Sequence, residues 1–294
     1  MHLLRPVLHW QAHCRSLVAA FGSAPDSYNG AVRSTALEGE IMLKLYHAEP
    51  LANSLKCLIP LKEKGLAFQS VYVDLHKFEQ HEPWFVAINP EGQVPVLEHD
   101  GVIVTHTTVN NEYLEDVFPD SPPLRPADAV GKARMRSWNK FVDEHVMNYV
   151  SMHGWHRMVS IIARSIDSGE FEKLVARIPL HEQREKWRTA RSGFSASDLA
   201  NATRKIEVAV DKVEQQLART PWLAGDLYTL ADINFFAHCG IAVNRLFPEM
   251  EVAKRAPRLM EWVERVEARP GVKEALAMPD KTNPALRTFS GEVR

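Results

Sequence analysis

The sequence is poor in cysteine, nearly balanced in charge and without a long apolar run. Its 294 residues include three cysteines, Cys14, Cys57 and Cys239, which form no CxxC pair. Neither a disulfide framework nor a zinc site is indicated, and we expect a reducing, cytoplasmic setting. A formal net charge of −2 gives no electrostatic reason to expect nucleic acid or an anionic membrane as a partner. No apolar run approaches the ~18 residues that span a bilayer, so no membrane partner is expected.

Motifs for phosphate and metal binding are lacking as well. Neither GxGxxG nor GxxxxGK[ST] occurs, so no glycine-rich loop is present to bind phosphates. His153 and His156 are three residues apart, but no HExxH motif or nearby acidic residue completes a ligand set. We therefore expect no metal.

The first 41 residues differ from the remainder of the chain. They show no clear periodicity and contain no acidic residue before Asp26. Arg5 and Arg15 interrupt any continuous apolar core, which argues against a signal peptide. Two interpretations remain open, namely a leader of the transit-peptide type and an upstream start with Met42 as the functional beginning. We expect residues 1–41 to be a poorly ordered extension.

From Met42 onward, the pattern predicts alternating strands and helices. Asp100-Gly101 between alternating apolar residues is a strong hairpin signal, and Gly65 marks a helix end. Asn53 or Ser54 is a natural N-cap. The predicted order is strand 42–46, helix 52–64, strand 69–73, a short irregular helix within 78–88, hairpin 96–105 and helix 107–118. A βαβ half thus joins a ββα half, and we place this α/β domain at 42–119.

The segment Gln93-Val94-Pro95 leads into this hairpin. A proline at the start of a strand must lie where its missing N–H is not needed. A cis peptide meets that condition and turns the preceding backbone outward. The N–H and C=O of Val94 are then expected to face a ligand, which is how thioredoxin-like domains hold a cysteine-containing peptide.

A proline-rich linker, 120–127, separates this domain from a part with helical periodicity, 128–278, and a tail, 279–294. Asp128 is the predicted N-cap of a long helix, and Thr229 with Asp232 forms a capping box before the most apolar helix, 233–243. The long helix is expected to bury one stripe of residues, and two amphipathic helices are predicted at 197–217 and 256–267. The members of the stripe are Met135, Trp138, Phe141, Val142, His145 and Tyr149.

An α/β thioredoxin-like N-terminal domain followed by an all-α C-terminal domain resembles the glutathione S-transferase fold. Within that superfamily the chain is similar to bacterial β-etherases of the LigF type, including subunits of heterodimers. The resemblance covers Met42 to about Met278. Its motifs are Ala52-Asn53-Ser54-Leu55-Lys56, Lys77-Phe78-Glu79-Gln80-His81, Ile88 to Pro95, Glu112 to Pro119, Val150-Ser151 with Gly154-Trp155, Trp187 to Phe194, and Thr229 to Ile233.

The resemblance implies a glutathione site with the sulfur at the start of the first helix. Asn53 and Ser54 would donate hydrogen bonds to the thiolate, next to the helix N-terminus; the alternative is an ordinary N-cap. Val94, within Gln93-Val94-Pro95, would pair its backbone with the cysteinyl part of glutathione. Gln80 and Lys77 are candidates for the glycine carboxylate, and a solvated loop is the equal alternative.

The γ-glutamyl end departs from the family pattern. The family usually has an acidic residue followed by Ser or Thr here, and this chain has His106-Thr107. Thr107 keeps the hydroxyl, but His106 cannot offer a carboxylate to the α-amino group. The loss of one charge-assisted contact costs about 1.5–3 kcal/mol.

In the helical part, Tyr149, His153 and Trp155 are candidates for an aromatic substrate wall, with core packing as the alternative. For Arg188 and Arg191 two positions are open, the mouth of the site and a solvated helix face. Cys57 lies near the resolving position of a thioredoxin-type pair, but no partner cysteine is present, so we expect a small buried residue.

The resemblance implies a cytoplasmic, dimeric glutathione transferase that cleaves β-aryl ethers of lignin-derived aromatic compounds. The thiolate of glutathione, as co-substrate, would attack the β-carbon. The alternatives are a non-catalytic or weakly catalytic subunit of a heterodimer, favoured by His106, and a general glutathione transferase for other electrophiles.

Overall fold

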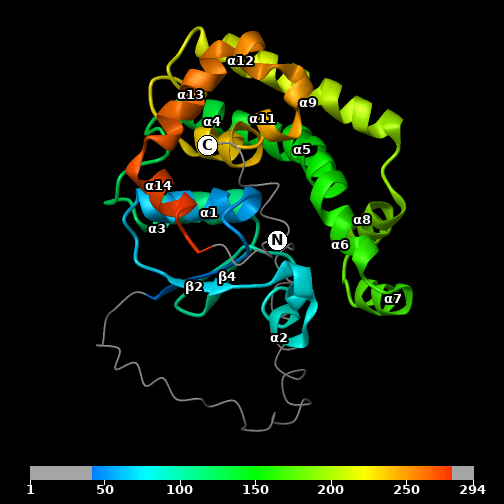
Figure 1. The fold of residues 1–294 in the computed structure, drawn as a ribbon. Coiled ribbons are helices and arrows are strands. Elements are labelled where there is room, and N and C mark those ends of the chain that lie inside the picture. Colours follow the sequence, from blue (N-terminus) through cyan, green and yellow to red (C-terminus); the bar gives the residue numbers. More distant parts are fainter. Residues whose placement is uncertain (1–41, 280–294) are drawn as a thin grey trace, which may run out of the picture. The chain divides into compact units, whose positions relative to one another are not determined.

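The computed structural model describes residues 42–279 (Figure 1). The predicted extension at 1–41 and the predicted tail from residue 280 onward lie outside the described residues. An α/β part comes first in the chain, and the segments after it are helical. This order agrees with the fold predicted from the sequence.

The α/β part contains one mixed four-stranded sheet in the order β2-β1-β3-β4. Strands β1 and β2 are parallel, and β3 is antiparallel to both β1 and β4. The parallel pair needs a crossover connection, which α1 supplies. The strands are β1 (Leu43–His47), β2 (Gln69–Tyr72), β3 (Val96–His99) and β4 (Val102–Val104). The predicted βαβ and ββα halves are thereby confirmed.

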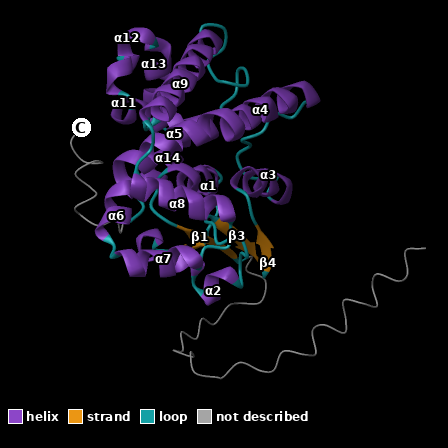
Figure 2. Cartoon of the chain, turned by 90° about the vertical axis from the view of Figure 1, so that its right-hand side faces the viewer, coloured by secondary structure: helices purple, strands orange, loops and turns teal. Residues whose placement is uncertain are grey.

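Helices cover both faces of the sheet (Figure 2). Helices α1 (Ala52–Glu63) and α3 (Thr107–Val117) lie on one face, where Leu45 joins the main hydrophobic core. On the other face, Tyr46 packs against Phe85 with ring centroids 6.2 Å apart. The irregular helix predicted within 78–88 corresponds to two short helices, η2 (Glu79–His81) and α2 (Pro83–Val86), and one further turn, η1 (Leu75–Lys77), precedes it.

One long helical segment, 129–165, is interrupted by two π turns. It consists of α4 (Ala129–Phe141), η3 (Val142–Val146), α5 (Met147–Gly154), η4 (Trp155–Val159) and α6 (Ser160–Ser165). Asp128 caps it by accepting a hydrogen bond from the Gly131 N–H at 2.8 Å, as predicted.

The buried stripe of this segment differs from the prediction after the first π turn. Val142 is buried as predicted, but the stripe continues through Val146 and Val150 instead of His145 and Tyr149. A π turn contains one more residue than an α turn, so the residues after it face a different direction. The prediction assumed uninterrupted α-helical spacing. It was wrong for His145, which is exposed, whereas Tyr149 is partly buried against the core.

The predicted capping box is confirmed at Thr229 and Asp232, and residues 230–240 are all buried. The buried helix begins at Leu230 and continues as a π turn to Gly240, so its end lies three residues before the predicted one. The helices from residue 168 to this point are α7 (Ser168–Ala176), α8 (His181–Ser192), α9 (Ala196–Leu217), α10 (Leu230–Phe235) and the π turn η5 (Phe236–Gly240).

Helix α14 lies beyond 256–267, the last helix that the sequence predicted. It packs on α1 so closely that a Cβ on Gly271 would lie 2.7 Å from the backbone nitrogen of Glu63. The segments are α11 (Val243–Leu246), η6 (Pro248–Met250), α12 (Val252–Arg255), α13 (Pro257–Glu267) and α14 (Pro270–Leu276). Within residues 42–279, no helix combines the length and apolarity needed to cross a membrane.

Candidate functional site

A pocket of about 340 Å³ lies where the start of α1, the loop before β3, the start of α3 and the long helical segment meet. It brings together six predicted site residues: Asn53, Gln93, Val94, Pro95, His106 and Thr107. The other residues that line it are Asn89, Glu91, Thr105, Thr108, Val109, Asp143 and Met147.

The first turn of α1 is arranged differently from the N-cap that the sequence suggested. The N-cap residue is Leu51, which provides no side-chain cap, so neither Asn53 nor Ser54 is the cap. Ser54 is buried, and its hydroxyl accepts a hydrogen bond from the Ala48 N–H at 3.1 Å. Asn53 lines the pocket instead, with its Oδ1 3.0 Å from Nε2 of His238.

The loop before β3 is shaped by side-chain hydrogen bonds and a glycine. Nδ2 of Asn89 donates to the Gln93 carbonyl at 2.8 Å, and its Oδ1 accepts from the Glu91 N–H at 3.1 Å. The Val94-Pro95 peptide bond is cis, as predicted. Because β3 begins at Val96, the backbone of Val94 lies just outside the strand and beside the pocket.

Gln80 lies beneath this loop and is not among the residues that line the pocket. It is buried, with Nε2 3.2 Å from Nε2 of His81. Burial lowers the pKa of His81 to about 4. Lys77, the other candidate for the glycine carboxylate, is largely exposed and pairs with Asp74 at 3.0 Å. The backbone of Gln80 lies against the loop at Gly92, and Lys77 belongs to a surface ion pair.

His106 lies in the turn between β4 and α3, close to an acidic residue of the loop before β3, Glu91. His106 has a φ of 66°, and Thr107 is the first residue of α3. Nε2 of His106 lies 4.0 Å from Oε1 of Glu91 at the pocket, where the His106 side chain is largely exposed and that of Glu91 is partly exposed. A carboxylate is thus present at this end of the pocket, although it comes from the loop before β3.

Below the pocket lies a polar network around Lys56, whose side chain is 2% exposed. Its Nζ lies 2.7 Å from Oδ1 of Asp143 and donates to Oγ1 of Thr108 at 2.6 Å. Thr108 in turn donates to Asp143 at 2.6 Å, and Asn234 donates to Asp143 at 3.0 Å.

The charges in this network shift one another's protonation. Burial lowers the pKa of Lys56, although the Asp143 carboxylate opposes that shift. Burial acts to raise the pKa of Asp143, but the charge of Lys56 and the hydrogen bonds outweigh it and lower that pKa. The network therefore ties α1 and α3 to the helical part at the floor of the pocket.

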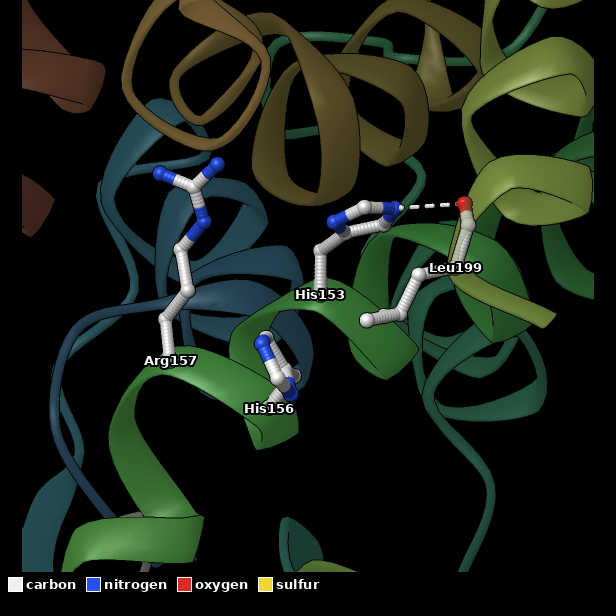
Figure 3. A pocket seen from close by; sticks show the side chains of 4 residues that line it. All are labelled: His153, His156, Arg157 and Leu199. Carbon is white, nitrogen blue, oxygen red and sulfur yellow. Dashed lines mark hydrogen bonds between the residues drawn. The ribbon is translucent and has the colours of Figure 1, made fainter. Parts of the chain in front are cut away.

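His153 lines a separate pocket of about 380 Å³ together with His156, Arg157 and Leu199. Figure 3 shows its imidazole turned toward α9, where Nε2 lies 3.2 Å from the Leu199 carbonyl oxygen. The ring also packs against Phe247 with centroids 4.6 Å apart. His153 therefore does not line the pocket at Asn53.

Tyr149 and Trp155 are partly buried and do not line the pocket at Asn53 either. Tyr149 packs against the main core. Trp155 belongs to a second cluster, 5.2 Å from the ring of Trp187 and 4.5 Å from Nζ of Lys186. Trp187 in turn packs 4.4 Å from Phe78 of the α/β part.

The arginines of α8 are engaged in contacts within the helical part. Arg188 pairs with Glu172 at 3.1 Å and Glu185 at 2.7 Å. Arg191 donates to the carbonyl oxygens of Ala163 and Ile166. Neither arginine lines the pocket at Asn53. Arg188 is exposed, as on a solvated helix face, whereas Arg191 is partly buried.

Cys57 is a buried residue, as predicted. It is 1% exposed, and burial raises the pKa of its thiol to about 12. A neutral, buried thiol has little reactivity.

Several residues of the site were missed by sequence reasoning. Asn89 and Glu91 lie inside a motif that carried the resemblance, and Thr108 follows Thr107 directly, so adjacency was an available signal. Asp143 and His238 carried no such signal. They come from helices 87 and 185 residues away from their partners Lys56 and Asn53, and only the folded chain joins them.

Family models match both parts of the chain. Residues 42–116 match the glutathione S-transferase N-terminal domain, and residues 185–265 match the glutathione S-transferase C-terminal domain. The chain therefore belongs to the glutathione S-transferase family, as the motifs predicted.

Among its relatives is protein LigF of Sphingobium sp. (strain NBRC 103272 / SYK-6), which is 46% identical over 236 residues, covering 79% of this chain and 92% of LigF. Glutathione S-transferase 3 of Zea mays is 28% identical over 236 residues, covering 80% of this chain and 93% of that protein. The crystal structure of β-etherase LigF from the same Sphingobium strain matches with a TM-score of 0.75 and 45% identity, covering 79% of this chain and 98% of LigF.

Proposed function

We propose that this protein is a glutathione-dependent β-etherase that acts on lignin-derived aromatic compounds. The observation that carries the proposal is the pocket that joins Asn53 to the cis Val94-Pro95 segment and to Thr107. The 46% identity to LigF, whose structure is described as that of a β-etherase, supports the choice of reaction.

Glutathione would lie along the pocket with its sulfur at the start of α1. There the Asn53 carboxamide and the positive end of the helix dipole favour the thiolate over the thiol. The backbone of Val94 would pair with the cysteinyl unit, with Gln93 and Pro95 flanking it. Thr107 and the N-terminus of α3 would bind the γ-glutamyl carboxylate.

The reaction is a displacement. The thiolate attacks the β-carbon of an α-keto β-aryl ether, so that a carbon–sulfur bond forms and the carbon–oxygen bond breaks. The electron pair of that bond leaves with the phenolate oxygen, which takes a proton from water. The protein contributes proximity and stabilisation of the thiolate.

Glu91 compensates for His106 in this account. Binding of the γ-glutamyl ammonium needs a carboxylate, and the family's usual position for it holds His106. Glu91 lines the same pocket within 4.0 Å of His106, so it can accept the ammonium in a charge-assisted hydrogen bond.

Ser54, Gln80, Tyr149, His153 and Trp155 were also predicted as site residues. Ser54 lies next to Asn53, which lines the pocket, and Gln80 lies beneath Gly92. We therefore propose that both residues support the site without contacting glutathione. The three helical residues keep the proposed substrate role only if the aromatic substrate extends beyond the pocket at Asn53.

We also propose a dimer, as the family resemblance implies, and a cytoplasmic location. Use of reduced glutathione fits a reducing compartment. Light scattering on the purified chain tests the oligomeric state.

The second candidate is a weakly catalytic subunit that acts in a heterodimer, which His106 favours. Retention of the purified chain on immobilised glutathione separates the two candidates. The β-etherase proposal expects retention and elution by free glutathione. A properly folded chain that passes through unretained would contradict it and favour the subunit.

A further inference from the structure

A buried histidine contacts the residue that the proposed reaction places at the sulfur. His238 lies on the π turn η5 and is 3% exposed. Its Nε2 is 3.0 Å from Oδ1 of Asn53, and its Nδ1 is 3.0 Å from the carbonyl oxygen of Asn234. Nothing in the displacement itself requires this side chain, so its position needs another explanation.

One neighbour of the ring, the Asn234 carbonyl oxygen, indicates where its hydrogen lies. A carbonyl oxygen only accepts hydrogen bonds, so Nδ1 carries the hydrogen and donates to Asn234. Burial first, and then the positive charge of Lys56, lowers the pKa of His238 to about 4, while Asp143 opposes that shift. The ring is therefore neutral near pH 7, and Nε2 is left as an acceptor.

An acceptor at Nε2 requires a donor on Asn53. A half-turn of the carboxamide about its last side-chain bond exchanges Oδ1 with Nδ2 and brings an N–H to Nε2. The amide nitrogen has a second N–H, which points in a different direction and remains available to a ligand. The histidine thus selects one of two carboxamide orientations that are nearly equal in shape.

We propose that His238 is a positioning residue for Asn53, which it holds through a hydrogen bond so that the second N–H of the carboxamide faces the glutathione sulfur. The inference rests on the proposed function, since that function places the sulfur at Asn53. His238 would thus give the helical part a role in thiolate formation, although the proposed function places the sulfur at the start of α1.

The surroundings hold His238 rigidly enough for this role. Asn234, which accepts the Nδ1 hydrogen, donates from its own side chain to Asp143 at 3.0 Å. Asp143 is in turn fixed by Lys56 at 2.7 Å. A support that is itself hydrogen-bonded keeps the Asn53 amide in place better than a surface residue would.

Two substitutions of His238 distinguish the contribution of Nδ1 from that of Nε2. In His238→Asn, the amide nitrogen can replace Nδ1 toward Asn234, but the side chain is too short to reach Asn53. In His238→Gln, the amide reaches the position of Nε2. The measurement is the ultraviolet absorbance of the thiolate in the glutathione complex, titrated against pH.

We expect His238→Asn to raise the pKa of the bound glutathione thiol by about one unit, with little change in the dissociation constant. His238→Gln should recover much of that shift. Equal pKa values for wild type and His238→Asn would overturn the inference, as would equal impairment by Asn and Gln.

A double-mutant cycle with Asn53→Ala separates this inference from the proposed function. If His238 acts through Asn53, His238→Asn has no further effect on the thiol pKa in the Asn53→Ala background. An equal effect in both backgrounds overturns the inference alone. If Asn53→Ala leaves the thiol pKa unchanged, the role of Asn53 at the sulfur falls, and the inference falls with it.

A second measurement covers the case in which His238→Asn does not fold. Nitrogen-15 chemical shifts of the His238 ring in the wild-type protein report which nitrogen carries the hydrogen. A protonated Nδ1 and an unprotonated Nε2, with an Nε2 shift that changes in Asn53→Ala, support the inference. A hydrogen on Nε2 overturns it.

Discussion

Glu91 and His106 lie close together at the pocket, and in the proposed function the carboxylate of Glu91 offsets the absence of an acid at position 106. A histidine alone cannot bind an ammonium by charge, but Glu91 lies 4.0 Å from it at the same pocket. The two side chains come from different loops, so the carboxylate is supplied from across the pocket. In the proposed function, Glu91 therefore reduces the deficit that the sequence suggested at His106.

Removing the charge of Glu91 tests this compensation. We expect Glu91→Gln to weaken glutathione binding by about one to two decades, since one charge-assisted contact is lost. Isothermal titration calorimetry measures the change. The matched control is Glu79→Gln, a nearby acid that is not among the residues lining the pocket. Similar affinities for the wild type and Glu91→Gln would assign the ammonium to another group.

Lys56 and Asp143 form the pair on which the floor of the pocket depends. Lys56→Met removes the cation and leaves a carboxylate of which only 32% is exposed. We expect a loss of about 3 kcal/mol in the free energy of unfolding, measured by urea denaturation. Since the cost arises from the unpaired carboxylate, Lys56→Met combined with Asp143→Leu should recover part of it. A double variant less stable than Lys56→Met would contradict this explanation.

At the scale of elements, the loop before β3 depends on Gly92. Gly92 has a φ of 63°, and a Cβ there would lie 2.6 Å from Nδ1 of His81 and 3.0 Å from the Gln80 carbonyl oxygen. Any side chain must therefore displace the loop that carries Val94. The glycine is required by both its backbone conformation and its close approach to the turn beneath it.

Gly92→Ala is accordingly expected to destabilise the protein by about 2 kcal/mol and to weaken glutathione binding. Gly65→Ala is a matched control, because Gly65 has a φ of 66° but a Cβ there meets nothing within 4 Å. The control should lose about 1 kcal/mol from backbone strain alone and keep its affinity. Equal losses of affinity in both variants would rule out a steric effect on the loop.

The π turns explain where sequence reasoning failed at this scale. Helical spacing located the long helix from residue 129 and its first buried residues, and it located the capping box at Thr229. It could not detect an extra residue within a turn, because a π turn leaves the composition and the caps unchanged. The predicted stripe therefore went wrong at His145, and Tyr149 is only partly buried against the core.

At the scale of the whole molecule, the α/β part was largely predictable and the floor of the site was not. The hairpin, the cis Val94-Pro95 bond and the pocket residues of the first domain all lie in short local motifs. Lys56–Asp143 and Asn53–His238 join the two parts of the chain, and no local pattern records such distant pairs. Their identification required the packing of helices from the second half against α1.

Two buried histidines should make the stability of the molecule depend on pH. Burial lowers the pKa of both His81 and His238 from about 6.5 to about 4. The unfolded chain takes up these protons as pH falls below about 6.5, whereas the folded chain does not until about pH 4. Their contribution to stability is therefore present above pH 6.5 and is lost as pH falls to about 4.

Urea denaturation at several pH values between 7 and 4 measures this dependence. Each histidine adds a slope of up to about 1.4 kcal/mol per pH unit to the free energy of unfolding. His238→Gln should remove one of the two contributions and flatten the curve. An unchanged slope in that variant would show that His238 titrates alike in the folded and unfolded chains.

The proposed function requires that this chain alone uses glutathione to cleave a β-aryl ether. The most direct measurement incubates the purified protein with glutathione and each enantiomer of an α-keto β-aryl ether, and quantifies the products. The account predicts one glutathione thioether and one phenol for each ether consumed, with a lower rate in Asn53→Ala. If folded protein with saturating glutathione forms neither product from the one enantiomer nor from the other, the proposed function is contradicted.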